Sequence, residues 1–228
     1  MNCIFCHNNS NTSKSIEHIV PESLGNKHAV LWKGAVCDKC NNYFATKIEK
    51  ELLQQLYFVS ARHRNIIKTK KRRYIQQEVF LINKKGQHVP ALFDYDGHSG
   101  NIYLRDLKDV NFLIRSGHII EPIILEPEAN NYILSRFLAK CAFEYLVYRT
   151  KEENFLEFSE SLKDEQFEPL RKYARYGEGY KFWPYSQRRI YGEGDQFKDR
   201  SNNKNYEVLN EMDFLAIELD HKIVNGDE

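Results

Sequence analysis

The chain begins Met1-Asn2-Cys3-Ile4-Phe5-Cys6, and a second cysteine pair with the same spacing follows as Cys37-Asp38-Lys39-Cys40. Each Cys-x-x-Cys turn presents two sulfur atoms on one side, and a tetrahedral zinc ion takes four thiolates. A disulfide is the weaker interpretation, because a Cys-x-x-Cys pair seldom bridges to itself in a structural role. We therefore predict that one structural zinc ion is bound by Cys3, Cys6, Cys37 and Cys40.

The interval between the two pairs contains the motif Ser15-Ile16-Glu17-His18-Ile19-Val20-Pro21, and Asn41 directly follows the last cysteine. The motif is typical of a strand that ends near Pro21. Adjacent strand residues point to opposite faces, so Glu17 and His18 can serve different partners only if the strand ends or twists there. Asparagine is also favoured at helix N-termini, which leaves Asn41 with two interpretations, a metal ligand or a helix cap.

These motifs together resemble the HNH endonucleases. Members of this family carry an acidic residue and a histidine on the first strand, then an apolar residue and a proline, and a polar ligand at the start of a helix. Many of them also carry the two cysteine pairs. The resemblance covers about residues 1–50, and His18 and Asn41 are twenty-three positions apart, as in the HNH domain of CRISPR RNA-guided nucleases. It implies a ββα-metal module, which we expect over residues 1–60.

The resemblance also implies roles for three residues. His18 would be the general base, because a neutral imidazole can take a proton from water near neutral pH. Glu17 and Asn41 would each give one oxygen ligand to a catalytic Mg²⁺ or Mn²⁺ ion. The reaction would hydrolyse DNA and leave 5′-phosphate and 3′-hydroxyl ends, with RNA left open as a substrate. Stand-alone bacterial members are often restriction or anti-phage defence effectors, and this association extends to the chain.

Two positions depart from the family pattern. The asparagine that usually braces the loop over the site would fall near Trp32, and Asn26 is the candidate replacement. Some members carry another histidine one turn after the first helical ligand, and Ala45 occupies that position. The catalytic metal would then have two protein ligands, which suits Mg²⁺ better than catalytic zinc.

An alternative from a different class is a catalytically silent zinc module that only binds nucleic acid or protein. Such a module would keep the four cysteines and the basic residues. It would have no use for Glu17 and His18, whose presence together with Asn41 favours the enzyme.

Basic residues cluster directly after the first predicted helix. That helix should run from Asn41 to about Ser60, and the apolar residues spaced by four on one face are Phe44, Ile48, Leu52 and Leu56. A charge run is usually a solvated face. Beside a nuclease motif, this one predicts contacts with DNA phosphates. The assigned residues are Arg62, Arg64, Lys68, Lys70, Lys71, Arg72 and Arg73.

The rest of the chain, residues 61–228, predicts an α+β region that selects the substrate or a partner. After the basic segment 62–73, alternating apolar residues predict a small antiparallel sheet over residues 74–120. A helical part follows at residues 128–165, and its strongest helix spans residues 130–150. The predicted apolar stripe of that helix is Ile133, Phe137, Cys141, Ala142, Tyr145 and Leu146.

The segment 167–191 mixes aromatic and basic side chains. Such side chains can stack on bases and hold phosphates, or they can pack at the edge of a core, and both interpretations stay open. It contains Tyr176-Gly177-Glu178-Gly179, and a second copy runs from its end over residues 191–194; both are predicted to be turns.

Composition sets broad limits on the protein. The 228 residues are 42% hydrophobic, enough for one or two compact domains. The net charge is only +1, so nucleic-acid contacts must come from local clustering. No apolar run approaches the roughly 20 residues of a membrane span, and we expect a reducing cytoplasm as the setting. The predicted fold class is α+β. A homodimer or a regulatory protein partner stays open.

Overall fold

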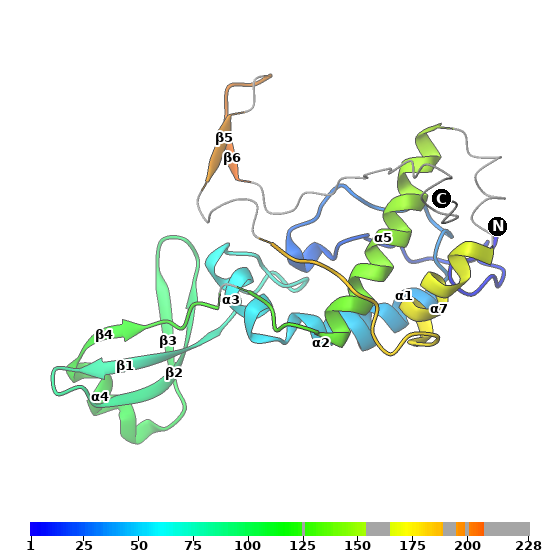
Figure 1. The fold of residues 1–228 in the computed structure, drawn as a ribbon. Coiled ribbons are helices and arrows are strands. Elements are labelled where there is room, and N and C mark those ends of the chain that lie inside the picture. Colours follow the sequence, from blue (N-terminus) through cyan, green and yellow to red (C-terminus); the bar gives the residue numbers. More distant parts are fainter. Residues whose placement is uncertain (125, 154–164, 189–194, 199–200, 208–228) are drawn as a thin grey trace, which may run out of the picture.

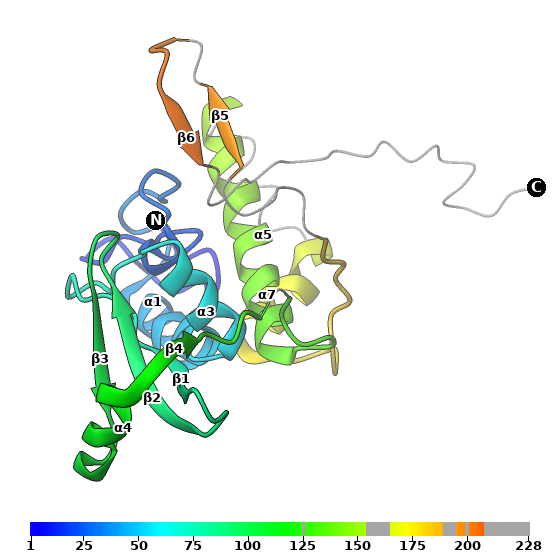
Figure 2. The ribbon, with the colours of Figure 1, turned by 90° about the vertical axis from the view of Figure 1, so that its left-hand side faces the viewer.

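The computed structural model describes residues 1–124, 126–153, 165–188, 195–198 and 201–207. We call residues 77–120 the sheet lobe, and residues 1–64 with the helices of residues 132–176 the helical region. Figure 1 shows the sheet lobe at one end of the molecule, and Figure 2 looks onto that end. Within the predicted elements, residues 154–164, residues 189–191 and the second Tyr-Gly-Glu-Gly copy lie outside the described residues.

Two short extended segments open the fold. His18 and Val30 form an antiparallel bridge. It is flanked by hydrogen bonds from Ile19 N to Ala29 O (3.1 Å) and from Leu31 N to Glu17 O (2.9 Å). A 3-10 turn, η1 (Glu22–Leu24), connects the two segments and ends at Gly25 with φ 92°. Helix α1 (Asp38–Phe44) follows. The order is the predicted two strands and a helix.

The helix after the second cysteine pair differs from the prediction at both ends. Helix α1 begins at Asp38, so Asn41 lies inside it and the capping interpretation of Asn41 is wrong. A π-helical turn, η2 (Ala45–Glu49), joins α1 to α2 (Lys50–Leu53), and Glu49 at its end is buried. The chain then leaves the helical path before α3 (Leu56–Arg64).

The break before α3 has a tertiary cause. Gln55 is extended (φ −68°, ψ 144°). Its side-chain amide exchanges two hydrogen bonds with Asn131, of 2.6 and 3.3 Å. Leu56 lies beyond the break and is 67% exposed, contrary to the prediction. The other three residues of the predicted face are fully buried: Phe44, Ile48 and Leu52.

The predicted antiparallel sheet is confirmed. Its strands are β1 (Gln77–Asn83), β2 (His88–Tyr95), β3 (Gly100–Leu104) and β4 (Ser116–Ile120), in the order β3-β2-β1-β4. A 3-10 turn, η3 (Leu107–Asp109), leads into α4 (Val110–Arg115). Phe112 and Leu113 of α4 pack against the buried residues of one sheet face, which are Val79, Leu81 and Ala91.

Two helices from the second half of the chain complete the core of the N-terminal segment. They are α5 (Tyr132–Glu153) and α7 (Glu168–Tyr176), which follows the 3-10 turn η4 (Glu165–Phe167). Phe5 lies edge-on to Phe44 and to Phe143 of α5, with centroid distances of 4.6 and 5.5 Å. The hydrophobic core of residues 3–58 is therefore continuous with α5 and α7.

The buried face of α5 differs from the predicted stripe. Phe137 and Cys141 are buried as predicted, but Ala142 is exposed. Lys140 and Glu144 are buried instead. Charged residues enter a core when they are paired, and a pattern that counts only apolar residues therefore misplaces this face.

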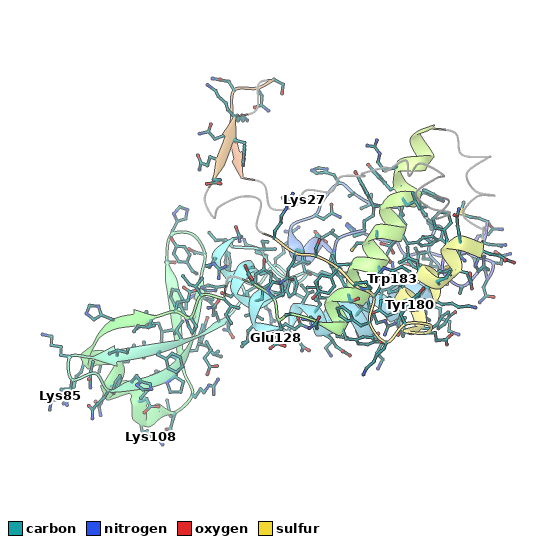
Figure 3. The ribbon with its side chains drawn as sticks, viewed as in Figure 1. Lys27, Lys85, Lys108, Glu128, Tyr180 and Trp183 are labelled. Carbon is teal, nitrogen blue, oxygen red and sulfur yellow. The ribbon has the colours of Figure 1, made fainter. Side chains whose placement is uncertain are left out.

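The aromatic-basic segment is part of the core where it forms α7. Arg171, Tyr173 and Arg175 are buried, so the core interpretation applies to them. Gly177 ends α7 with φ 73°, which confirms a turn at the first Tyr-Gly-Glu-Gly copy. Tyr180 and Trp183 lie beside each other next to these helices, with centroids 4.7 Å apart (Figure 3).

A separate two-stranded sheet pairs β5 (Gln196–Lys198) with β6 (Asn205–Glu207). Among the helices of the described residues, none has the length and apolar character that a membrane span requires.

Candidate active site and metal centre

The four predicted zinc ligands come together in the structure. The Sγ atoms of Cys3, Cys6, Cys37 and Cys40 all lie within 4.8 Å of one another. A tetrahedral zinc ion with bonds of about 2.3 Å places its sulfur ligands about 3.8 Å apart. Cys6 Sγ and Cys37 Sγ are 3.6 Å apart, so the donor set fits one zinc ion.

Hydrogen-bond donors near the sulfur atoms stabilise negative charge on this centre. The Cys37 backbone N–H donates to Cys3 Sγ at 3.3 Å. A hydrogen bond from Cys40 lowers the pKa of Cys3 to about 4. Nε of Arg175 donates to Cys40 Sγ at 3.2 Å, and its guanidinium lies over the Tyr43 ring. Helix α7 therefore brings a buried positive charge to a centre that carries thiolates.

The side chains of residues 17–19 alternate between two faces, as expected for a strand. Glu17 and Ile19 are buried in the interior, whereas His18 between them is half-buried and lies on the other face. Nδ1 of His18 is buried and has no hydrogen-bond partner among the described residues. One ring nitrogen is thus enclosed, which leaves Nε2 as the nitrogen available to chemistry.

Asn26 braces the loop that joins the two extended segments. Its Nδ2 donates to Val20 O (2.7 Å) and Ala29 O (2.9 Å), and its Oδ1 accepts from the N–H groups of His28 (3.1 Å) and Ala29 (3.0 Å). All of its hydrogen-bonding groups are used, since an asparagine amide offers two donors and one carbonyl oxygen. This is the bracing expected of Asn26.

Helix α1 holds the chain just before the strand at two points. The carboxylate of Asp38 accepts from the backbone N–H groups of Lys14 (3.0 Å) and Ser15 (2.8 Å) and from the Ser15 hydroxyl (2.5 Å). These hydrogen bonds lower the pKa of Asp38. One turn later, Asn41 Nδ2 donates to Ile16 O at 3.3 Å. Asn41 therefore lies beside the residue that precedes Glu17.

Beneath the strand lies a buried ionic cluster, which we call the Lys140 cluster. Its members are Glu17, Glu49, Lys140 and Glu144. Nζ of Lys140 lies 2.7 Å from Glu17 Oε1, 3.0 Å from Glu49 Oε1 and 3.1 Å from Glu144 Oε2. Burial disfavours its charge, but attraction to the three carboxylates raises the pKa of Lys140 well above its usual range.

The pKa values on the two faces of the strand shift in the directions that burial dictates. Burial raises the pKa of Glu17, and the charges of Lys140 and Lys70 oppose that shift. Burial lowers the pKa of His18, and the same two lysines lower it further. His18 is therefore a neutral imidazole at neutral pH.

Most of the predicted basic segment forms an exposed turn close to the strand. The turn closes through hydrogen bonds from Arg72 N to Thr69 O (2.8 Å) and from Thr69 N to Arg73 O (2.9 Å). Arg72 adopts φ 60°. The charge of Lys70 reaches both Glu17 and His18. The exposed basic residues here are Lys68, Lys70, Lys71, Arg72 and Arg73.

Two residues of the predicted basic segment are placed differently. Arg62 is only 7% exposed, and its guanidinium contacts Leu53 O at 3.5 Å. Arg62 is thus a correction to the predicted set, because a buried guanidinium cannot meet a phosphate. Arg64 is half-buried and bonds to the Ser60 hydroxyl.

Comparison with known families adds the identification of the N-terminal domain. Residues 3–57 match the HNH endonuclease family. The resemblance found in the sequence is confirmed, and the N-terminal domain is an HNH domain with a four-cysteine metal centre. No curated protein and no solved structure matches the chain significantly. The family match supports a nuclease-type function acting on nucleic acid.

Sequence reasoning missed the residues that surround these motifs. Lys140 lies far from the motifs along the chain, and nothing in its own neighbourhood marks it. Glu49 lies eight positions after Asn41, and Arg175 belongs to the aromatic-basic segment, but neither position predicts the contact that the fold gives it. Asp38 could have been found, because an acidic residue in the first turn of a helix is a common signal. Its hydrogen bonds to residues 14 and 15 depend on the fold.

Proposed function

We propose that this protein is a metal-dependent endonuclease that hydrolyses DNA phosphodiester bonds. His18 acts as the general base, and Asn41 provides an oxygen donor for Mg²⁺ or Mn²⁺. The observation that carries the proposal is the position of His18, which projects from a paired strand opposite the buried Glu17, with Asn41 of α1 held against Ile16.

The chemistry assigned to His18 follows from its surroundings. Its lowered pKa keeps the imidazole neutral, and Nδ1 is enclosed, so Nε2 accepts the proton of the attacking water. The oxygen of that water attacks phosphorus, the P–O3′ bond breaks, and the departing O3′ takes a proton from solvent. The products carry a 5′-phosphate and a 3′-hydroxyl. One such site cuts one strand at a time.

Asn41 is the residue that fits a hard cation in this proposal. It is anchored through Nδ2, which leaves its carbonyl oxygen as a donor. The predicted ligand role of Glu17 is corrected, because Glu17 is buried, faces away from His18 and pairs with Lys140 at 2.7 Å. An amide carbonyl oxygen suits Mg²⁺ or Mn²⁺. When bound, the cation would stabilise charge at the scissile phosphate.

The exposed turn of residues 68–73 supplies the substrate contact in this proposal. Its five basic side chains are exposed, and the charge of Lys70 extends to the strand that carries His18. DNA as the substrate and a restriction or anti-phage role extend the family resemblance to this chain.

The test compares His18→Ala with the matched control His28→Ala. His28 is an exposed histidine on the loop that joins the two extended segments. In plasmid nicking with Mg²⁺ or Mn²⁺, His18→Ala should lose about 10²–10⁴-fold in rate, the usual contribution of a general base. The control should keep the wild-type rate, and both variants should keep bound zinc and DNA affinity.

The pH profile adds a second check. The base must be neutral, so the rate should rise with pH through the pKa of His18, which lies below the ordinary value of about 6.5. Glu17 also titrates, so the imidazole is followed directly by NMR. Full activity in His18→Ala excludes this mechanism. A wild-type protein that binds DNA but never cuts it favours the silent zinc module.

A further inference from the structure

We propose that Lys140, which lies on α5 outside the family match, is a positioning residue for the strand that carries His18. This inference rests on the proposed function. It adds a residue from the second half of the chain to the nuclease site, and it makes α5 part of the working unit rather than a neighbour of it.

The ammonium group of Lys140 points at the backbone of the strand that carries His18. Besides its three carboxylate partners, Nζ donates to His18 O at 3.1 Å and to Ile19 O at 3.2 Å. Together with Glu17 Oε1 at 2.7 Å, three of its five partners belong to three consecutive residues of one strand. A lysine that only balanced charge in a core would not need to contact those two backbone carbonyl groups.

Cys141, the neighbour of Lys140 on α5, contacts the same strand. Cys141 Sγ donates to the same Ile19 carbonyl at 3.0 Å. Two consecutive residues of α5 therefore contact one strand residue. Burial raises the pKa of Cys141 above its usual range, which keeps the thiol protonated and able to donate.

The burial of the Lys140 cluster restricts movement of the strand of residues 17–19. The Lys140 side chain is fully buried, and so is that of Glu144. A buried charge needs its partners, because an unpaired ion is strongly disfavoured in an interior. The strand cannot move away from α5 without leaving the ammonium group short of three of its partners. Lys140 thus fixes the backbone of His18 while the imidazole lies on the opposite face.

The π-helical turn η2 also contacts Lys140. Its π-helical turn ends at Glu49, which is buried and bonds to Lys140 at 3.0 Å. This contact links the helix that carries Asn41 to the same ammonium group. Lys140 therefore connects both elements assigned to the site, the strand of residues 17–19 and the helix that begins at Asp38.

The test uses the double variant K140M/E144Q and the control E144Q. The double variant replaces the contacting pair Lys140 and Glu144 by neutral side chains of similar size. The control retains Lys140 with its strand contacts. In DNA nicking, K140M/E144Q should lose about 10²-fold in kcat, since misplacement of a catalytic group by about 1 Å has that effect. KM should stay within about twofold of the control.

Amide hydrogen exchange gives a readout independent of cleavage. The amides of Ile19 and Leu31 form the strand pairing, and in K140M/E144Q they should exchange at least about tenfold faster than in E144Q. The Asn41 amide, bonded to Cys37 O at 2.9 Å, should be unchanged. Zinc content should equal that of the wild type. If K140M/E144Q fails to bind zinc, K140M/E144L with the control E144L replaces it, because apolar residues are often tolerated in place of a buried ion pair.

The outcomes separate this inference from the proposed function. A kcat of the double variant equal to that of E144Q overturns the positioning role. A wild-type protein without cleavage overturns the proposed function, and with it the catalytic part of this inference. In that case, unchanged exchange at Ile19 and Leu31 also overturns the placement of the strand by Lys140.

Discussion

The helical region and the sheet lobe reach order by different means. The helical region buries a four-cysteine centre and the Lys140 cluster inside a core built from residues 3–58 and from α5 and α7. In the sheet lobe, the fully buried apolar side chains among the described residues are Val79, Leu81 and Ala91, and its strands are joined by backbone pairing.

This difference shows where chemistry is tied to folding. In the helical region, the groups that hold the fold adjoin the groups assigned to catalysis: Cys40 precedes Asn41, and Glu17 precedes His18. In the sheet lobe, the alternation of apolar residues defines the strands.

The largest expected effect is the removal of zinc. Cys3→Ser, or a strong chelator, should unfold the first fifty residues, because metal ligation supplies folding free energy to such a segment. Exchange protection at Ile19 and Leu31 should be lost. Amides in the β1–β2 pairing should stay protected, since their hydrogen bonds lie within the sheet lobe. Metal analysis and residue-resolved hydrogen exchange check both statements.

One cooperative transition of the whole chain would break the comparison, because the two regions would then be one folding unit. A Cys3→Ser protein with full protection at Ile19 would refute the structural role of zinc. Lys39→Ser, an exposed change between Cys37 and Cys40, is the control.

The next largest effect concerns the exposed turn of residues 68–73, which we call the basic turn. Each phosphate neutralised on duplex DNA contributes about −0.9 to the slope of log K against log salt. Replacing four of its residues with glutamine should flatten that slope by about two to four. The four residues are Lys70, Lys71, Arg72 and Arg73. DNA binding at a series of salt concentrations measures the slope, and binding should weaken similarly on all sequences.

The matched control removes four exposed positive charges from the sheet lobe, where Lys85 and Lys108 lie at the far end (Figure 3). The substituted residues are Lys84, Lys85, Lys108 and Arg115. This control should keep the wild-type slope. An equal loss from both sets would mean that the basic turn has no special role and that the lobe contributes to capture.

The smallest expected effect tests whether α7 supports the metal centre of the helical region. Arg175→Met removes the guanidinium that donates to Cys40 Sγ at 3.2 Å. Zinc affinity should fall about 10–100-fold, the usual cost of losing a partner of a metal ligand. Competition with a chromogenic chelator measures it. Lys172→Met, an exposed change on the same helix, is the control. Equal affinity in the two variants would detach α7 from the metal centre.

The sequence predicted well wherever the determining residues are close in the chain. The Cys-x-x-Cys turns converge as predicted, and the strands of the sheet lobe follow the alternation of their apolar residues. The bracing by Asn26 was also within reach, because its partners are all within six positions of it.

The errors fall where distant contacts decide the outcome. The helix predicted to Ser60 breaks because Gln55 pairs with Asn131, seventy-six positions away. Arg62 is an exception, because it turns inward to Leu53, which is only nine positions away. The stripe on α5 was misplaced because Lys140 finds its carboxylate partners at positions 17, 49 and 144.

The sequence by itself determined the four-cysteine centre, the HNH motif and the α+β class, because local turns and periodicity define them within short stretches of chain. Only the tertiary structure decided that α5 and α7 complete the core, that Glu17 points inward to Lys140, and that His18 faces the other way. The physical reason is the cost of burial. A charge inside a protein is stable only beside its partners, and here those partners are brought together by the fold and not by their order in the chain.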